Sequence, residues 1–130
     1  MRSKSKKLSK AKADKYFSLY IRTRDANKGL ISCCTCGRLI PIKEADCGHF
    51  LSRRFEATRY DERNANGQCK KCNRFEYGNQ YEHGLYVDDK FGKGTADNLL
   101  LKARMLCKRN QYDYEAIAEE FKNKLVKLQS

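Results

Sequence analysis

Apolar residues recur at helical spacing near both ends of the chain, whereas the middle carries only short apolar pieces. No Gly or Pro interrupts the stretch from Leu8 to Lys28, and one face of it carries Tyr16, Phe17, Tyr20 and Ile21. This periodicity predicts an amphipathic helix with a basic remaining face that ends near Gly29. Residues 1–7 have no apolar anchor beyond Met1 and are predicted to be a flexible basic arm.

Residues 30–78 break this regularity, because short apolar pieces alternate there with Cys, Gly and charged residues. This pattern predicts small strands and tight loops around a metal, with a short helix over residues 70–78. The helical pattern returns after Gly78. Asn79–Phe91 is one predicted helix, and Thr95 and Asp113 are the predicted N-caps of two more.

The whole pattern predicts an α+β protein with a single domain over residues 8–130. We expect an N-terminal helix (8–29), a metal-containing core (30–78) and a helical C-terminal part (79–130). The last helix has an apolar face made by Ile117, Phe121, Leu125 and Leu128. This face packs either on its own domain, which we favour, or on a second copy in a homodimer.

Charge points to a polyanionic partner. The formal net charge is +12, and residues 1–28 hold ten Lys or Arg against two acids. Such a surface suits sequence-independent contact with a phosphate backbone, although it can also be merely a solvated basic face. The chain has no apolar run of about 18 residues and no signal-peptide pattern. We therefore expect a soluble, cytoplasmic protein without a membrane partner.

The cysteines indicate a metal rather than disulfides. Seven is an odd number, and two pairs have the spacing Cys-x-x-Cys: Cys33 with Cys36, and Cys69 with Cys72. Two such pairs complete a tetrahedral sulfur shell, which predicts a closed, structural zinc site. Cys34 could replace Cys33, but only Cys33 has the two-residue spacing to Cys36. Cys47 and Cys107 are predicted to be small buried apolar residues.

His49 is a candidate for chemistry because it lies between the two halves of the predicted zinc site. It follows Gly48, which allows close approach of backbone or ligand, and Asp46, Arg53 and Arg54 flank it. A lone histidine is more often structural, but this mixture suits a metal and a phosphate. The second histidine, His83, is predicted to be an ordinary residue on a helix surface.

The order of these residues resembles the motif of the HNH, or ββα-metal, nucleases. The matching positions are Cys33 and Cys36, His49, Asn64, Cys69 and Cys72, and then Asn73. The chain is also similar to the zinc-clamped phage resolvase endonuclease VII, which has Asn after its second cysteine pair. The closer resemblance is to the phage NinG (Rap) family of recombination endonucleases. It rests on EADCGHF, RYDERNANGQCKKCN and GNQYEHGL, within about residues 15–92.

The resemblance implies a small zinc-clamped ββα-metal core and a set of catalytic roles. His49 would take a proton from the attacking water, and Asn73 would bind Mg²⁺ or another divalent cation, with Asp46 as a second ligand. Asn64 would tie the loop so that the imidazole points correctly. HNH nucleases often have an acidic residue or His directly before the catalytic His, where this chain has Gly48.

Phosphate contacts are expected from basic residues of the same region, with Arg53 also counted among the catalytic residues. The predicted nucleic-acid contacts are Arg53, Arg54, Arg59, Arg63, Lys70 and Lys71. The alternative for Arg59 and Arg63 is simple pairing with Asp61 or Glu62.

The function expected from this resemblance is Mg²⁺-dependent cutting of branched DNA, such as four-way junctions or D-loops, in the host cytoplasm. Two alternatives stay open: a zinc-ribbon module that binds nucleic acid without cutting it, and an HNH nicking or homing-type enzyme without branch selectivity. A homodimer is plausible for symmetric cutting of a junction.

Overall fold

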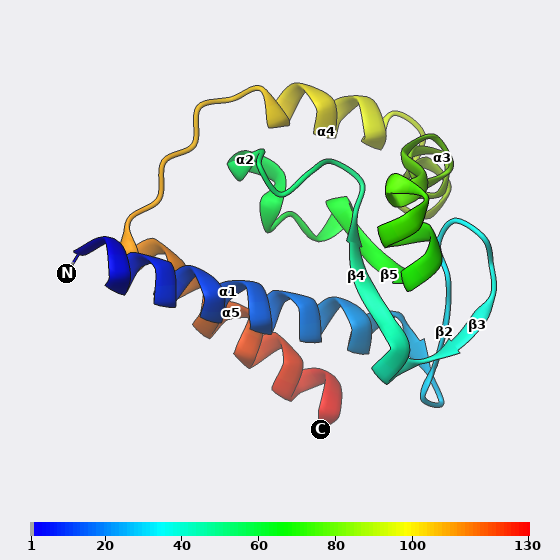
Figure 1. Ribbon diagram of the computed structural model, residues 1–130, viewed down its shortest axis with the longest axis horizontal. Helices are drawn as coiled ribbons and strands as arrows, with labels where there is room; N and C mark the ends of the chain where they lie inside the picture. Colours follow the sequence, from blue (N-terminus) through cyan, green and yellow to red (C-terminus); the bar gives the residue numbers. More distant parts are fainter. Residues whose placement is uncertain (1) are drawn as a thin grey trace.

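The computed structural model describes residues 2–130, and its longest elements are two helices that cross the molecule side by side (Figure 1). The first, α1 (Arg2–Asp25), begins well before Leu8. Residues 2–7, which the sequence predicted to be a flexible arm, are thus helical in the structure; Met1 lies outside the described residues. The segment contains no Gly or Pro, and its Lys and Arg residues favour helix, so it continues the helix that follows.

A tight hairpin follows α1 directly. Strand β1 (Ala26–Asn27) pairs antiparallel with β2 (Leu30–Ser32), and Lys28 and Gly29 between them have φ angles of 53° and 79°. Two consecutive positive φ angles are typical of a type I′ hairpin turn. Gly29 therefore lies in a hairpin turn. The sequence pattern had predicted that Gly29 ends the helix, but α1 ends at Asp25.

Two small antiparallel sheets form the middle of the chain. The first has the order β1-β2-β3, with β3 at Leu39–Pro41, and the second pairs β4 (Ala45–His49) with β5 (Ala65–Cys69). A short helix, α2 (Glu56–Arg59), lies in the connection between β4 and β5. These short strands confirm the mixed α+β character that the middle of the sequence predicted.

Helix α5 (Gln111–Gln129) packs on α1 through part of its apolar face, with the two helices running in the same direction (Figure 1), while Leu128 is 47% exposed. Phe121 is 2% exposed and meets Phe17 edge to face, with 4.9 Å between the ring centroids. This agrees with packing on the same domain; the homodimer stays a prediction. Asn110 caps the helix, and Asp113, the predicted cap, is instead its partner in a capping box.

Helix α3 (Gln80–Phe91) contacts β5 through His83, and α4 (Thr95–Ala103) packs beside α3. Both helices contribute to an apolar cluster whose buried members are Phe50, Leu51, Val87 and Leu99. Thr95 is the first residue of α4 and not its cap, because Gly94 occupies the cap position with a left-handed backbone. No helix within residues 2–130 is long and apolar enough to cross a membrane.

Candidate functional site

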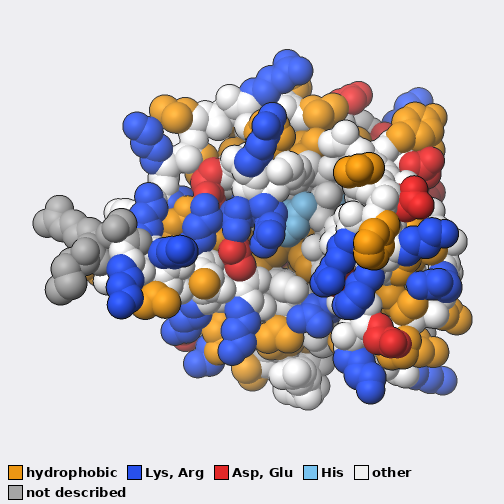
Figure 2. Space-filling view, in the orientation of Figure 1, with side chains coloured by type: hydrophobic (Ala, Val, Ile, Leu, Met, Phe, Trp, Pro, Cys, Tyr) orange, Lys and Arg blue, Asp and Glu red, His pale blue; other side chains and the backbone are white. Residues whose placement is uncertain are grey.

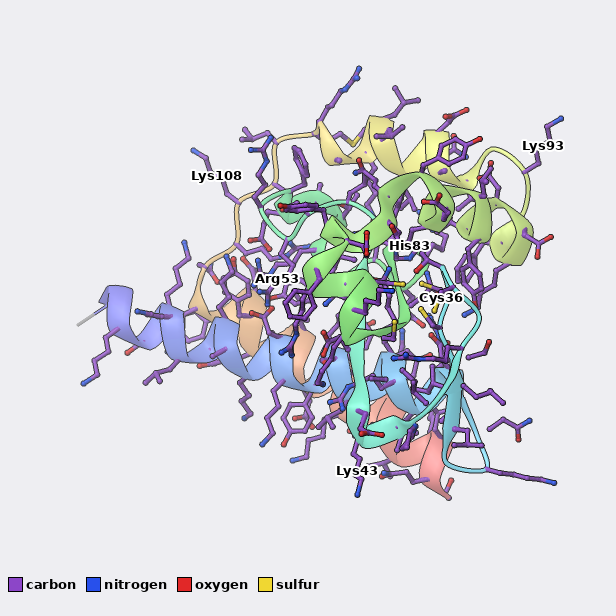
Figure 3. All side chains as sticks on the ribbon, turned by 45° about the vertical axis from the view of Figure 1, so that its right-hand side comes forward. Cys36, Lys43, Arg53, His83, Lys93 and Lys108 are labelled. Carbon is purple, nitrogen blue, oxygen red and sulfur yellow. The ribbon has the colours of Figure 1, made fainter. Side chains whose placement is uncertain are left out.

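Four cysteine sulfurs gather where the first sheet meets the end of β5. The Sγ atoms of Cys33, Cys36, Cys69 and Cys72 all lie within 4.8 Å of one another, and those of Cys36 and Cys69 are 3.8 Å apart. Figure 3 shows sulfur atoms beside Cys36. Tetrahedral zinc with Zn–S bonds of about 2.3 Å would place its sulfurs roughly 3.8 Å apart. The thiols are thus placed to bind one metal ion, and a sulfur-only shell fits structural zinc.

The backbone prepares this site for thiolates. The Cys69 amide donates to the Cys33 sulfur at 3.3 Å, and the Cys72 amide donates to the Cys69 sulfur at 3.4 Å. Burial opposes ionisation of Cys33, but the amide hydrogen bonds prevail and lower its pKa to about 6. The thiolate is the form that binds zinc.

The remaining cysteines lie outside the sulfur cluster. Cys34 is buried, and desolvation raises the pKa of its thiol far above the ordinary value, so Cys33 and not Cys34 completes the cluster. Cys47 and Cys107 are half-buried, whereas buried side chains were predicted, and neither belongs to the sulfur cluster.

A cavity of about 710 Å³ lies between α1, β4 and the turn that follows β5. Five residues that the sequence analysis singled out line it: Asp46, His49, Arg53, Lys70 and Asn73. They come from β4, from the loop after β4 and from the turn that follows β5. Figure 2 shows Lys and Arg side chains on both sides of an accessible histidine, which is His49 because His83 is fully buried.

His49 is held in one orientation at the end of β4. Its Nε2 lies 3.0 Å from the backbone carbonyl oxygen of Arg59, and its ring packs 5.8 Å from that of Phe17. A carbonyl only accepts, so Nε2 carries the proton and Nδ1 keeps a lone pair. Burial is the main reason that the pKa of His49 is lowered to about 4, and nearby Arg53 adds to the shift. The ring is therefore neutral at physiological pH.

Asn64 ties the loop between β4 and α2. It is fully buried, its Oδ1 accepts from the Leu51 amide at 2.9 Å, and its Nδ2 donates to the carbonyls of Leu51 and Thr58. The loop that it closes carries Arg53 and leads to Arg59, whose carbonyl holds His49. These contacts give the predicted loop-tying role a physical basis, while its effect on catalysis stays a prediction.

Asp46 and Asn73 form one part of the cavity wall, where the Asn73 Nδ2 donates to Asp46 Oδ2 at 2.9 Å. Asn73 lies on a single turn of π-helix, Lys71–Phe75, a form that often marks functional sites. Lys70 and Arg74 also contact the Asp46 carboxylate, at 3.3 Å and 2.9 Å. Burial would raise the pKa of Asp46, but hydrogen bonds from Asn73 and Arg74 hold it below its usual range.

The oxygens of Asp46 and Asn73 fit a hard divalent cation such as Mg²⁺. The Asn73 amide nitrogen faces Asp46, which leaves its Oδ1 for another partner. Lys70 and Arg74 would have to release the carboxylate for an ion to bind there, because they contact both of its oxygens.

Gly48 occupies the position before His49 for a steric reason. A Cβ atom at this position would lie 2.1 Å from Oε1 and 2.9 Å from Cβ of Gln68, which is fully buried. Gln68 in turn donates to the Gly78 carbonyl at 2.8 Å. An acidic residue at position 48, as many HNH nucleases have, would therefore clash with the glutamine.

The predicted phosphate-binding arginines divide into two groups. Arg53 and Arg54 are exposed, whereas Arg59 forms a bidentate pair with Asp14 and Arg63 pairs with Asp61. Arg63 follows the pairing alternative with Asp61, and Arg59 pairs with a residue of α1 that we did not foresee. Lys71 is exposed, outside the cavity lining.

Other residues line the cavity without having been predicted as site residues, among them Arg22, Lys43, Arg74 and Tyr77. Arg74 directly follows Asn73, so the basic run around the second cysteine pair carried a signal for it. Arg22 lies on α1, and only the packing of α1 against β4 brings it to the site.

His83 is buried, which corrects its prediction as a surface residue. It is fully inaccessible on the inner face of α3, and its Nε2 lies 3.1 Å from Asn66 Nδ2 (Figure 3). Burial lowers its pKa to about 4. His83 has no place in the cavity lining, so it supports the fold.

Comparison with known proteins identifies the family. The family model described as Bacteriophage Lambda NinG protein matches residues 1–130, a longer stretch than the residues 15–92 over which we expected the resemblance. No curated protein and no solved structure matches the chain. The relation to HNH nucleases and to endonuclease VII stays a prediction. Because the family model spans the full length of the sequence, the chain belongs to the phage NinG family.

Proposed function

We propose that this protein is a metal-dependent DNA endonuclease that cuts branched recombination intermediates. One observation carries the proposal: a neutral His49 with a lone pair on Nδ1 lines the same cavity as Asp46, Asn73 and several basic side chains. A base, oxygen ligands and cations in one cavity suit hydrolysis of a phosphodiester. Selectivity for branched DNA rests on the family resemblance.

His49 is the general base of the proposed reaction. Its Nδ1 takes a proton from a water molecule lined up with the scissile phosphorus, while the Arg59 carbonyl keeps the ring in position through Nε2. A phosphate beside the ring favours the protonated imidazole, and so raises its pKa from the low value of the DNA-free protein. The products carry a 5′-phosphate and a 3′-hydroxyl.

The cationic side chains orient the substrate. The exposed Arg53 and the half-buried Arg22 on α1 both line the cavity. They can therefore hold phosphates on either side of the cleaved bond. Lys70 and Arg74, once they leave Asp46, are further phosphate ligands. A divalent cation bound by Asp46 and Asn73 would stabilise the negative charge on the phosphate and on the leaving oxygen.

The proposal is tested with end-labelled four-way junctions and linear duplexes of matching sequence, each with and without added Mg²⁺. Omitting Mg²⁺ is preferable to adding a chelator, because a chelator can also remove zinc from the four cysteines. We expect Mg²⁺-dependent cuts near the branch. His49→Ala should slow them by about 10²- to 10⁴-fold, as is typical for loss of a general base.

The variant must keep its zinc content, melting temperature and DNA affinity for the result to report on chemistry. Equal cutting of both substrates would indicate an HNH nuclease without branch selectivity. Tight complexes that are never cut, with any divalent metal, would contradict the proposal and indicate a binding module.

A further inference from the structure

The segment after the second cysteine pair exposes three aromatic side chains within seven residues. Phe75 and Tyr81 are each 76% exposed and Tyr77 is 94% exposed. Large aromatic side chains contribute most to the stability of a fold when they are buried. A run of exposed aromatic side chains is therefore typical of a binding surface.

The backbone of this segment is held in a costly conformation. Tyr77, Gly78 and Asn79 all have positive φ, at 52°, 80° and 46°. For residues other than Gly, such a conformation persists only where surrounding contacts enforce it. The contacts here are the Gln68 side chain, which donates to the Gly78 carbonyl at 2.8 Å, and the Asn79 amide, which donates to the Glu76 carbonyl at 2.9 Å. A fully buried residue thus holds the turn that presents Tyr77 to solvent.

Tyr77 lies at the edge of the candidate active site. It lines the same cavity as His49 and Asn73. Lys70, Lys71 and Arg74, which precede it in the chain, are all exposed. Exposed aromatic rings combined with a cationic groove are the usual means of binding single-stranded nucleic acid, because each unpaired base offers a face for stacking.

We propose that the Tyr77 ring is a stacking platform for an unpaired base next to the phosphate in the cavity, assisted by Phe75 and Tyr81. The inference rests on the proposed function and adds a residue that selects the substrate. In a linear duplex the base faces are covered by their neighbours, whereas a branch point exposes them. Tyr77 would therefore discriminate in favour of branched DNA, and Gln68 would be the positioning residue behind it.

The test measures binding without Mg²⁺, so that it does not depend on cleavage. The probes are a junction with unpaired bases at its branch point, one of them 2-aminopurine, and a linear duplex of the same sequence. The variants are Tyr77→Ala and Tyr77→Phe. The matched control is Tyr112→Ala, because Tyr112 is 72% exposed and lies near Lys108 and Arg109 in a separate depression.

We expect Tyr77→Ala to weaken binding of the junction by about tenfold, the effect of losing one stacked base. Binding of the linear duplex should change less than about twofold, and stacking-induced quenching of 2-aminopurine should disappear. Tyr77→Phe should keep both affinity and quenching, because it keeps the ring. Tyr112→Ala should bind both DNAs as the unchanged protein does.

The inference is overturned if Tyr77→Ala weakens both DNAs equally at an unchanged melting temperature, if it changes neither, or if Tyr112→Ala has the same effect. If Tyr77→Ala binds the junction as the unchanged protein does, the exposed aromatic segment would instead be a binding surface for a protein partner. If the unchanged protein quenches the probe but never cuts DNA when Mg²⁺ is added, the platform stands and the endonuclease proposal fails.

Discussion

The two histidines of the chain have opposite hydrogen-bond environments. His49 donates through Nε2 to the Arg59 carbonyl, whereas His83 Nε2 faces the Nδ2 of Asn66 and must accept. The orientation of the Asn66 amide is settled, because its Oδ1 accepts from Arg24 and Lys90. Neutral His49 therefore carries its proton on Nε2 and neutral His83 carries it on Nδ1.

This difference gives a prediction for the DNA-free protein. Burial lowers the pKa of each histidine to about 4, so both rings should be neutral at pH 6 and should show opposite tautomers in long-range ¹H–¹⁵N spectra. His49→Ala assigns the two sets of signals. A His49 ring that is doubly protonated at pH 6, or protonated on Nδ1 alone, would contradict the role of His49 as a base.

The same shifts predict how stability depends on pH. An unfolded histidine has a pKa of about 6.5, so the unfolded chain binds protons that the folded chain does not as the pH falls from about 6.5 to 4. The contribution of the neutral rings to stability is thus complete above about pH 6.5 and declines below it.

The sequence was enough to predict His49 as a site residue, but not to predict that His83 is buried. On α3 the apolar residues Tyr81 and Leu85 are 76% and 56% exposed, while His83 and Val87 are fully buried. From the apolar positions alone, one would expect Tyr81 and Leu85 to face the core and His83 to face the solvent. Burial of His83 depends on Asn66 and Phe50, which contact it from β5 and the end of β4.

At the scale of elements, the four cysteines join segments that have little apolar packing of their own. The other buried residues of the apolar cluster around them are Ile31, Ile40 and Ala45. A metal bound by the four cysteines would thus be the main link between the turn after β2 and the turn after β5, because short strands alone are marginal.

We therefore predict that Cys36→Ser removes the metal and destabilises this region. The expected loss is at least about 3 kcal/mol, or roughly 10 °C in Tm for a chain of this size. Metal analysis should find one zinc per chain in the unchanged protein. Cys107→Ser is the control, since Cys107 lies outside the cluster. Retention of zinc by Cys36→Ser would mean that another residue replaces the ligand.

Sequence predicted a helix or strand well where residues close together in the chain decide it. Helical periodicity identified α1, α3 and α5, because spacing along one helix is a local property. The starts of α4 and α5 were misplaced, since Thr95 and Asp113 resemble caps but Gly94 and Asn110 occupy those positions. Several residues near a helix start can serve as its cap, and packing decides among them.

At the scale of the whole molecule, the net charge of +12 should make DNA binding strongly dependent on salt. Arg53, exposed beside the cavity, tests whether the charges at the site take part (Figure 3). Arg53→Ala should reduce the slope of log K against log salt concentration by about 1, and equally for junction and duplex. The measurement is fluorescence anisotropy over a series of salt concentrations.

Lys93→Ala serves as the control, because Lys93 is exposed in the loop before α4 and far from Arg53 (Figure 3). If both substitutions change the slope alike, DNA binding is spread over the surface and the cavity has no special share in it.

Spacing and composition along the chain were enough to predict the family, the four clustered cysteines, the basic character and the helices at both ends. These features depend on residues that are close to one another in the sequence. The fold was needed to show that His49, Asp46, Asn73 and Tyr77 share one cavity, that Arg59 pairs with Asp14, and that Gln68 leaves room only for Gly at position 48. The reason is physical: hydrogen-bond partners, burial and steric limits come from residues that are distant in the chain, and no local pattern encodes which of them will meet.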